Sequence, residues 1–434
     1  MFANMRREVF MESSSAENNT HPPSVRKARS LCLSFPSEAD YQFCIADRRC
    51  CRDYLQEQFH HHPELFPAGW AEGFTFHGFV TSHKQGLHQR RVKLKATGHA
   101  YQIRPSFMMP YMIGRTAEVE KALFLRRWGV PFEALAYVFG RNPMYWYRAY
   151  VSLGRASIVG TTLKDPARLP THVLADEKHT RLDGEKVYVA TTVAHECILG
   201  AEVVEQADTP TLTQGYQVFR QEASELNPEY QPHTVTTDKW EATRQAWKDL
   251  FPLSTLILCF LHAVLKIKNR CRSDRSRWAQ LREKVWHVYG APTLAAFAQR
   301  LRRLREWATP QPLLASAKEK VLDLCGHAAD FKKAYAHPGA YRTSNALERL
   351  MNYQDRVLYA MQYFHGHIAS ASLYARAMAL VWNFHPYDQR TQKKYGPRAS
   401  PFERVNGFRY HDNWLENLMV AASLRGRKPS HKIR

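Results

Sequence analysis

The stretch that decides the fold comprises four short pieces, THVLAD (171–176), KVYVATTVA (186–194), CILGAEVV (197–204) and HTVTTD (233–238). Each piece is apolar and rich in β-branched side chains, which is typical of strands, and the second and third lie close together as in a hairpin or meander. Helical patterns occupy residues 214–224 and 239–249, and TLILCF (255–260) is again strand-like. Strands that are first paired and then alternate with helices predict a mixed α/β sheet.

Two of these predicted strands end in aspartate, at Asp176 and Asp238. Ligands of open α/β sheets bind beyond the carboxyl ends of strands, so two such acids can share one cation site. A third acid, Glu348, lies in the first turn of a helix predicted from TSNALERLM, with Ser344 or Asn345 as its cap. Oxygen ligands on a partly open site suit Mg²⁺ or Mn²⁺. A pair of such ions can activate a weak nucleophile and stabilise a leaving oxygen in phosphodiester attack.

Other acids near these positions remain alternatives. Asp355 lies seven residues after Glu348 and faces a similar direction on the same predicted helix, so it is the second choice for the third ligand. Glu177 is the alternative to Asp176, and the alternation of side chains along a strand predicts that it points to the opposite face.

Length, charge and cysteine usage limit the class of protein. The chain has 434 residues, and about 150 residues per domain suggests two to four domains. Lys and Arg total 61 against 40 acidic residues, and the net charge of +21 predicts a polyanionic partner, usually nucleic acid. The eight cysteines are scattered, and the sequence has neither a signal peptide nor an apolar stretch of about 18 residues. We expect a reducing, cytoplasmic setting and no membrane contact.

Residues 117–153 have the pattern of three short helices, separated at Gly129 and Gly140. Short helices joined by glycine-containing turns predict a helix-turn-helix, in which the later helix enters the major groove of DNA. A plain three-helix bundle with an aromatic core is the alternative. The predicted DNA contacts of this region are Asn142, Tyr145, Arg148 and Arg155.

The segments that flank these helices carry weaker signals. Residues 12–24 are polar and predict a disordered leader, followed by a short basic run at Arg26, Lys27 and Arg29. A structural Zn²⁺ needs four well-spaced ligands, and no common zinc signature is matched closely before residue 110, so this ion is only a secondary expectation. The Cys and His residues in question are Cys44, Cys50, Cys51, His60, His61, His62, His77, His83 and His88.

From Leu261 to about Ala336 the pattern is almost purely helical and very basic. Its first basic residues, Lys266, Lys268 and Arg270, are predicted to contact DNA backbone. Three tryptophans could stack on unpaired bases or, as helix faces favour, fill the core of a bundle; they are Trp278, Trp286 and Trp307. The C-terminal tail SLRGRKPSHKIR (423–434) predicts a flexible, phosphate-binding arm.

The succession of strand–Asp, meander, strand–Asp–helix, strand with Cys-x-x-His, basic helical insert and helix–Glu resembles the catalytic core of the DDE transposases. That core has an RNase H-like fold, and the resemblance is to the bacterial insertion-sequence and Mutator-like group. It covers roughly residues 170–385. The resembling pieces are LADEKHTRLDGEKVYVATTV (174–193), TVTTDKWEATRQAWKDLFP (234–252), CFLHAVLKIKNR (259–270) and RTSNALERLMN (342–352).

The resemblance implies that Asp176, Asp238 and Glu348 are catalytic metal ligands. It also implies that Cys259 and His262 match the Cys-x-x-His of this group, although a core cysteine and a capping histidine are the alternative. The spacing 348 − 238 = 110 is long. Mutator-like relatives place a helical insertion between these acids, whereas retroviral-type integrases place them much closer.

The implied function is a DNA transposase that cleaves transposon ends and joins them to double-stranded target DNA, as a homo-oligomer on the bacterial nucleoid. The expected fold is an RNase H-like mixed sheet interrupted by an all-α insertion and preceded by a helix-turn-helix. Two alternatives stay open: a DNA-binding regulator built on an inactive core, and an RNase H-like nuclease that cuts without joining. The expected layout is a leader (1–30), an N-terminal Cys/His-containing region (31–115), the helix-turn-helix (116–160), the catalytic core (168–262 and 340–390), the helical insertion (263–339) and a C-terminal basic segment (391–434).

Overall fold

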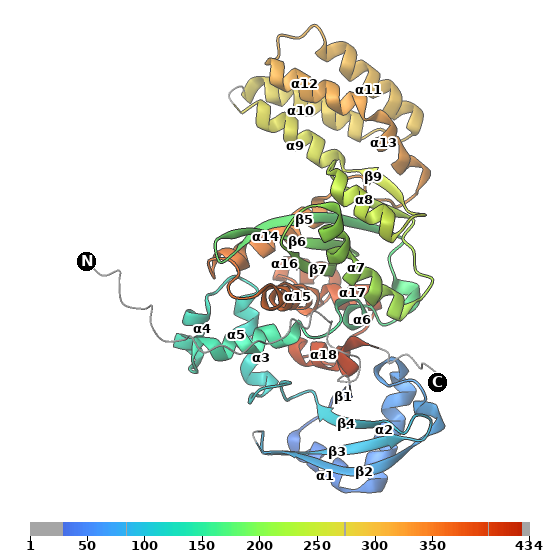
Figure 1. The fold of residues 1–434 in the computed structure, drawn as a ribbon, viewed down its shortest axis with the longest axis vertical. Helices are drawn as coiled ribbons and strands as arrows, with labels where there is room; N and C mark the ends of the chain where they lie inside the picture. Colours follow the sequence, from blue (N-terminus) through green and yellow to red (C-terminus); the bar gives the residue numbers. More distant parts are fainter. Residues whose placement is uncertain (1–28, 84, 273–274, 398, 428–434) are drawn as a thin grey trace, which may run out of the picture.

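The computed structural model describes residues 29–83, 85–272, 275–397 and 399–427. The predicted leader up to residue 28, with Arg26 and Lys27, and the tail from residue 428 lie outside the described residues. Figure 1 shows three parts along the long axis of the molecule: an N-terminal sheet with helices at one end, a central sheet covered by helices, and a helical arm at the other end.

The central sheet is mixed, as the sequence predicts, and has the strand order β7-β6-β5-β8-β9. The first three strands in the chain form an antiparallel meander, and β8 and β9 run parallel to β5. The helices α7 (Thr209–Leu226) and α8 (Glu241–Leu250) cover one face, where the sheet presents Val173 and Ala175. The strands are β5 (His172–Leu182), β6 (Glu185–Ala194), β7 (Cys197–Val204), β8 (Thr234–Thr237) and β9 (Thr255–Leu258).

Strand β5 continues past the expected strand end at Asp176, to Leu182. The reason is a two-residue hairpin turn at Asp183 and Gly184, whose φ angles are 48° and 90°, as type I′ turns require. The extended half of β5 pairs with β6 in register as far as the pair Leu182–Glu185. Asp176 therefore lies inside a strand, at the level where the parallel neighbour β8 ends.

The other face of the central sheet packs against α14 (Asn345–Tyr359), α15 (Ile368–Phe384) and the three helices predicted before the sheet. Those helices form as α3 (Thr116–Arg126), α4 (Phe132–Phe139) and α5 (Pro143–Leu153). They share one hydrophobic core with α14 and α15 and do not make a separate bundle. The buried Arg126 joins them, since its guanidinium donates to Tyr374 Oη at 2.7 Å and to the Val357 carbonyl at 2.8 Å.

The N-terminal region contains a second mixed sheet, of order β1-β4-β3-β2, which the sequence analysis does not anticipate. Strand β1 runs parallel to β4, and the other pairs are antiparallel. Tyr41, Leu55 and Trp70 contribute to a core of its own. The elements are β1 (Ser30–Leu33), α1 (Glu38–Ala46), α2 (Arg48–His61), η2 (Pro63–Leu65), η3 (Trp70–Glu72), β2 (Phe74–Ser82), β3 (Leu87–Leu94) and β4 (Ala100–Pro105).

The helical arm is the predicted insertion between β9 and α14, and it has a separate core that includes Leu281, Leu301 and Val321. The three tryptophans of the arm are partly buried and pack against this core, as helix faces favour, so they are not free stacking platforms. The helices are α9 (Phe260–Arg270), α10 (Arg275–Tyr289), α11 (Leu294–Ala308), α12 (Ala315–Gly326), α13 (Ala328–Lys332) and η5 (Lys333–Ala336).

The C-terminal segment contributes to the core of the molecule. The predicted flexible arm (423–434) follows α18 (Trp414–Ala421); its first residues are packed within the molecule, and residues 428–434 lie outside the described residues. Helix α18 is buried along its length because its sequence, WLENLMVA, is almost entirely apolar. Beyond it, Ser423 is buried and its hydroxyl accepts a hydrogen bond from the Cys32 amide at 3.2 Å. The remaining elements are α6 (Ile158–Thr162), η4 (Pro166–Arg168), α16 (Gln389–Tyr395), α17 (Pro401–Asn406) and η6 (Ser423–Gly426).

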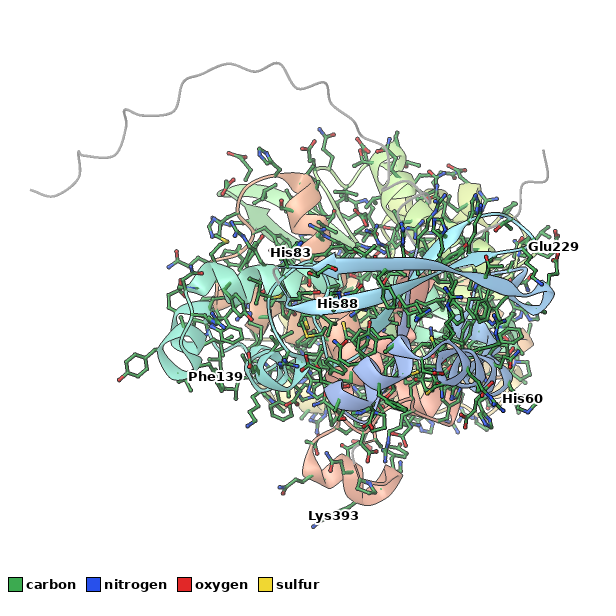
Figure 2. The ribbon with its side chains drawn as sticks, turned by 90° about the horizontal axis from the view of Figure 1, so that it is seen from below. His60, His83, His88, Phe139, Glu229 and Lys393 are labelled. Atoms are coloured by element: carbon green, nitrogen blue, oxygen red, sulfur yellow. The ribbon has the colours of Figure 1, made fainter. Side chains whose placement is uncertain are left out.

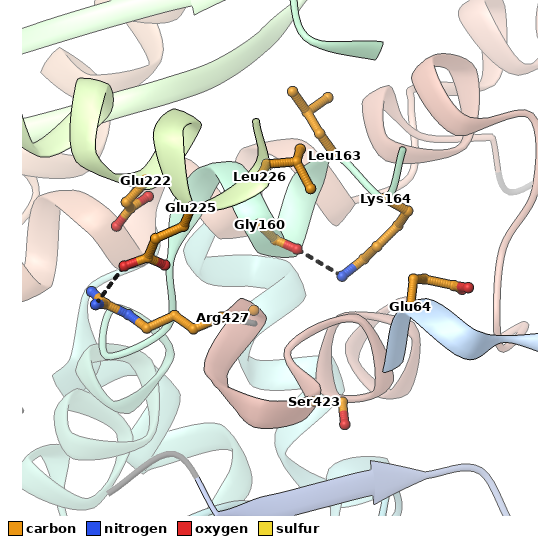
Figure 3. Close-up of a pocket in the computed structure, with 10 residues that line it drawn as sticks. Glu64, Gly160, Leu163, Lys164, Glu222, Glu225, Leu226, Ser423 and Arg427 are labelled. Carbon is orange, nitrogen blue, oxygen red and sulfur yellow. Dashed lines mark hydrogen bonds and ion pairs between the residues drawn. The ribbon is translucent and has the colours of Figure 1, made fainter. Parts of the chain in front are cut away.

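Figure 3 shows how the start of the tail is fixed between α6 and α7. Arg427 forms an ion pair with Glu225 at 3.1 Å, and the Lys164 ammonium donates to the Gly160 carbonyl at 2.8 Å. Arg427 is therefore engaged within the molecule. Among the described residues, no helix combines the length and the apolar character that a membrane span requires.

Candidate metal centre

The register of the central sheet brings two of the predicted acids side by side. Parallel strands β5 and β8 pair His172 with Thr234 and Leu174 with Thr236. The same register continued by two residues sets Asp176 opposite Asp238, which directly follows β8. Neighbouring strands lie about 4.8 Å apart, so the two carboxylates start from adjacent backbone positions on the same side of the sheet.

Two further side chains reach Asp176 from helices. Glu348 lies in the first turn of α14, and His262 lies in the first turn of α9, directly after β9. The His262 Nε2 atom is 3.4 Å from Asp176 Oδ2 and 3.4 Å from Glu348 Oε1. One ligand atom from each of these three residues lies within 4.8 Å of the other two. This is the one group of three or more potential metal ligands among the described residues.

Asp238 lies beside this group and is not one of its three members. Its Oδ1 atom accepts a hydrogen bond from the Trp240 amide at 2.7 Å, so the carboxylate fixes the turn that leads into α8. Its negative charge nevertheless affects the site, because it contributes to the raised pKa of Asp176. The structure thus brings Asp176 and Glu348 together directly and places Asp238 next to them.

Burial governs the electrostatics of the centre. Burial, opposed by His262 and reinforced by Asp238, raises the pKa of Asp176 to about 6. Burial works against a charged His262, yet the Cys259 thiol and the Glu348 carboxylate outweigh it and raise the pKa of His262 to about 11. A hydrogen bond from His262 lowers the pKa of Glu348. The two acids thus favour positive charge at this point, and His262 would bind a metal ion only as the neutral imidazole, after losing its second ring proton.

The donor set fits a divalent ion. Two carboxylates and one imidazole converge, and a third carboxylate lies in register beside them. Carboxylate oxygens suit Mg²⁺ and Mn²⁺, and an imidazole extends the choice toward Mn²⁺. His262 is only partly exposed, and its Nδ1 atom is buried without a hydrogen-bond partner among the described residues.

The two alternative acids have other partners. Glu177 points to the opposite face of β5, as the strand alternation predicts, and accepts hydrogen bonds from Tyr216 Oη at 2.5 Å and Thr243 Oγ1 at 2.8 Å. Asp355 forms an ion pair with Lys178 at 2.6 Å. Both carboxylates therefore have other partners, and neither belongs to the Asp176–His262–Glu348 group.

Cys259 and His262 have different roles in the structure. Cys259 is buried at the N-cap position of α9, where its Sγ atom accepts a hydrogen bond from the Ser344 amide at 3.2 Å. Ser344 in turn precedes α14 without a side-chain capping bond. The thiol thus joins the starts of the two helices that carry His262 and Glu348. A core cysteine fits one of the sequence alternatives, whereas His262 faces the carboxylates and does not cap a helix.

The predicted DNA contacts of α5 are in part engaged within the molecule. Asn142 caps the helix by accepting a hydrogen bond from the Tyr145 amide at 2.7 Å, and Tyr145 Oη donates to the Ile113 carbonyl at 2.8 Å. Arg148 is exposed on the helix. Arg155, also exposed, lies over the ring of Tyr111 at 4.6 Å.

The predicted contacts of the arm are open to solvent. Lys266, Lys268 and Arg270 are exposed on α9, while Val264 and Ile267 of the same helix are buried. Lys266 follows His262 by four residues, which places both on one side of the helix. A basic side chain therefore stands one turn away from the candidate metal centre.

The Cys and His residues of the N-terminal region form no metal-binding group of three or more among the described residues. In Figure 2, His60 lies across the N-terminal unit from His83 and His88, so these three histidines do not meet at one point. Cys44 and Cys51 are buried as free thiols in the core of the N-terminal unit. The structure therefore offers no support for the secondary expectation of a structural Zn²⁺ there.

Lys178 is a functional candidate that the sequence analysis does not name. It lies two residues after Asp176, on the same face of β5, and its ammonium lowers the pKa of Glu348. The signal that could have found it is the strand alternation itself, once β5 is known to continue beyond Asp176.

Neither a protein-family model nor a curated protein matches this chain.

Proposed function

We propose that this chain is a DNA transposase whose central domain has an RNase H-like fold. The support is the succession of elements: a meander opened by the strand of Asp176, a parallel strand ending before Asp238, a helical insertion and the helix of Glu348. The resemblance implies this succession. The net charge of +21 supports DNA as the partner.

The observation that carries the proposal is the convergence of Asp176, His262 and Glu348 from distant parts of the chain, with one ligand atom of each within 4.8 Å of the other two. Asp176, Asp238 and Glu348 would hold Mg²⁺ or Mn²⁺, with His262 as a further possible ligand. Two bound ions supply activation of the attacking oxygen and stabilisation of the leaving 3′-oxygen.

The chain's own residues perform the remaining work. The sheet register and the Cys259–Ser344 contact position the acids, so that little rearrangement is needed when the DNA backbone arrives. Exposed Lys266, one helical turn after His262, supplies positive charge near the acids, where phosphate groups would lie. In the first step water attacks the phosphorus at the transposon end, the P–O3′ bond breaks and a 3′-hydroxyl is released. In the second step this 3′-hydroxyl attacks a phosphorus of the target DNA, and the target's own 3′-oxygen leaves as a hydroxyl. Assembly as a homo-oligomer on nucleoid DNA is part of the proposal.

The test uses the purified full-length chain with plasmid DNA that carries its gene and flanking sequences. We expect Asp176→Ala, Asp238→Ala and Glu348→Ala each to lower Mg²⁺-dependent cleavage at least about a thousandfold, because each removes a group that holds the ions. DNA binding in a gel-shift assay should stay within about threefold of the parent, since the acids contribute no favourable contact to phosphate.

Asp355→Ala is the matched control, because it removes an acid of the same helix that is paired with Lys178. It should retain cleavage within about tenfold. Full activity in any of the three site variants would contradict the assignment. Binding without cleavage by the parent would favour the regulator, and cleavage without strand-transfer products would favour the nuclease.

A further inference from the structure

A second charged region lies at the junction between the N-terminal unit and the core. A cleft of about 530 Å³ opens there, between the N-terminal sheet on one side and the end of α5, α18 and η6 on the other. Four arginines line it, namely Arg29, Arg104, Arg155 and Arg425, and no described residue of the lining is acidic. Such a concentration of one sign favours a polyanion.

Tyr111 organises two of these arginines. The guanidinium carbons of Arg155 and Arg425 lie 4.6 and 5.5 Å from the centre of its ring, and Arg425 Nε donates to Tyr111 Oη at 3.0 Å. Cation–π contacts of this kind hold a guanidinium in place without neutralising its charge. The two arginines are thus ordered and still able to bind an anion.

The backbone around this contact is strained. Tyr111, Leu424 and Arg425 have φ angles of 67°, 53° and 59°, in the left-handed region that non-glycine residues rarely adopt. Buried Leu424 anchors one wall, and the Arg425 carbonyl accepts a hydrogen bond from the Ser157 amide at 2.9 Å. Tyr111 itself is 56% exposed, so burial of its ring does not account for the strain. Strained residues held by their surroundings concentrate at binding sites.

Glutamines of the N-terminal sheet hold the segment that presents Tyr111. Gln85 Nε2 donates to the carbonyls of Met109 and Met112, at 3.1 and 3.0 Å, on either side of the tyrosine. Gln89 and then Gln102 continue the hydrogen-bonded row across the sheet. The arginine-lined cleft is therefore formed jointly by the N-terminal unit and the core. It exists only when these two parts are packed together.

We propose that this cleft binds the phosphate backbone of double-stranded DNA. Tyr111 is the one aromatic residue among the described residues of the lining, and its ring carries the arginines, so the cleft offers no free ring on which an unpaired base could stack. Arg148, outside the lining, is also exposed on α5, the helix whose end forms part of the cleft. The inference rests on the proposed function. It identifies a surface, separate from the metal centre, to which the DNA binds.

The experiment compares Arg155→Gln and the double variant Arg155→Gln/Arg425→Gln with the parent. The probes are a 40-base-pair duplex of mixed sequence and one of its single strands, with binding measured by fluorescence anisotropy at several salt concentrations without divalent ions. We expect duplex affinity to fall about 10-fold for Arg155→Gln and about 100-fold for the double variant. The slope of log K against log salt should fall by about 1 and about 2, because each lost phosphate contact removes about 0.9.

The control is Arg48→Gln/Arg49→Gln, which removes the same charge from exposed positions on α2, outside the cleft. It should keep duplex affinity within about threefold. An equal loss in this control would show a general charge effect and overturn the inference, as would a loss confined to the single strand. Parent-like duplex binding by Arg155→Gln and the double variant would overturn the inference alone. A parent that binds neither probe would overturn the DNA partner of the proposed function as well.

Discussion

The central sheet brings carboxylates together, whereas the N-terminal sheet contributes to a cleft lined with arginines. The negative site arises from strand register, since Asp176 and Asp238 occupy equivalent positions on adjacent parallel strands. The positive cleft arises from the docking of two units, because Arg104 and Arg155 come from opposite walls. One site depends on pairing within a sheet and the other on an interface. We therefore expect the two sites to respond differently to divalent ions.

Chelation of divalent ions should separate the two sites most strongly. With EDTA, cleavage should fall at least about a thousandfold, because the carboxylates then hold no ion. Duplex binding at constant ionic strength should change less than about threefold, since arginine–phosphate contacts need no metal. Cleavage products and anisotropy are measured on the same samples. Cleavage that survives chelation would remove the basis for a metal centre.

Substitution should distinguish arginines whose ion pairs stabilise the fold from arginines whose charge is exposed and able to bind a partner. Arg376 is buried, forms ion pairs with Glu222 and Glu202, and donates to the Gly154 carbonyl at 3.0 Å. Arg376→Met should lower the free energy of unfolding by about 3–5 kcal/mol, because it leaves buried carboxylates unpaired. Exposed Arg155→Gln should change it by less than about 0.5 kcal/mol.

Urea unfolding measures both variants. Adding Glu222→Gln to Arg376→Met should recover part of the loss, since the unpaired charge is then removed. Equal stability of the two arginine variants would contradict the distinction between paired and presented charges.

The smallest expected effect is that of buried His385 on the pH dependence of stability. Burial and the nearby Arg127 lower the pKa of His385 to about 3, against 6.5 for an unperturbed histidine. The unfolded chain takes up a proton below pH 6.5 that the folded chain excludes, so this group's contribution to stability falls as pH decreases from 6.5 toward 3. The loss is about 1.4 kcal/mol per pH unit, or about 2 kcal/mol between pH 6.5 and 5.

Urea unfolding of the parent and of His385→Gln at pH 7 and pH 5 measures this contribution. The variant should lose less stability between the two pH values than the parent. Exposed His60→Gln is the matched control and should follow the parent. Parallel behaviour of His385→Gln and the parent would exclude His385 as the source of acid sensitivity.

Much of the central sheet follows from local pattern. The strands β6 to β9 and the helices α3 to α5 lie close to where the apolar runs and the glycine breaks predict them. The full length of β5 had a signal too, because Asp183-Gly184 is a strong two-residue hairpin sequence. The N-terminal sheet had a weaker sequence signal. Its strand β3 is basic, and no local pattern identifies β2 and β4 as its partners.

The candidate sites differ in the same way. Asp238 could be predicted because it directly follows a strand, and Asp176 because an apolar run ends there, although β5 continues to Leu182. Glu348 depended on resemblance until the structure placed it near Asp176. The direction in which His262 points follows from the start of α9 after β9 and cannot be read from a Cys-x-x-His spacing. The arginine cleft joins residues 29, 104, 155 and 425, which share no local pattern at all.

The long helical arm lies between Asp238 and Glu348 in the sequence, so it is synthesised after the first two acids and before the third. Asp176 and Asp238 leave the ribosome first, and Glu348 follows 348 − 238 = 110 residues later. At common rates of synthesis this interval lasts roughly 5 to 20 seconds. The arm is synthesised during that time and is complete at Ala336, before α14 and its glutamate exist. A nascent chain therefore cannot assemble the complete acidic site, and whatever activity the site has begins only after synthesis has passed the arm.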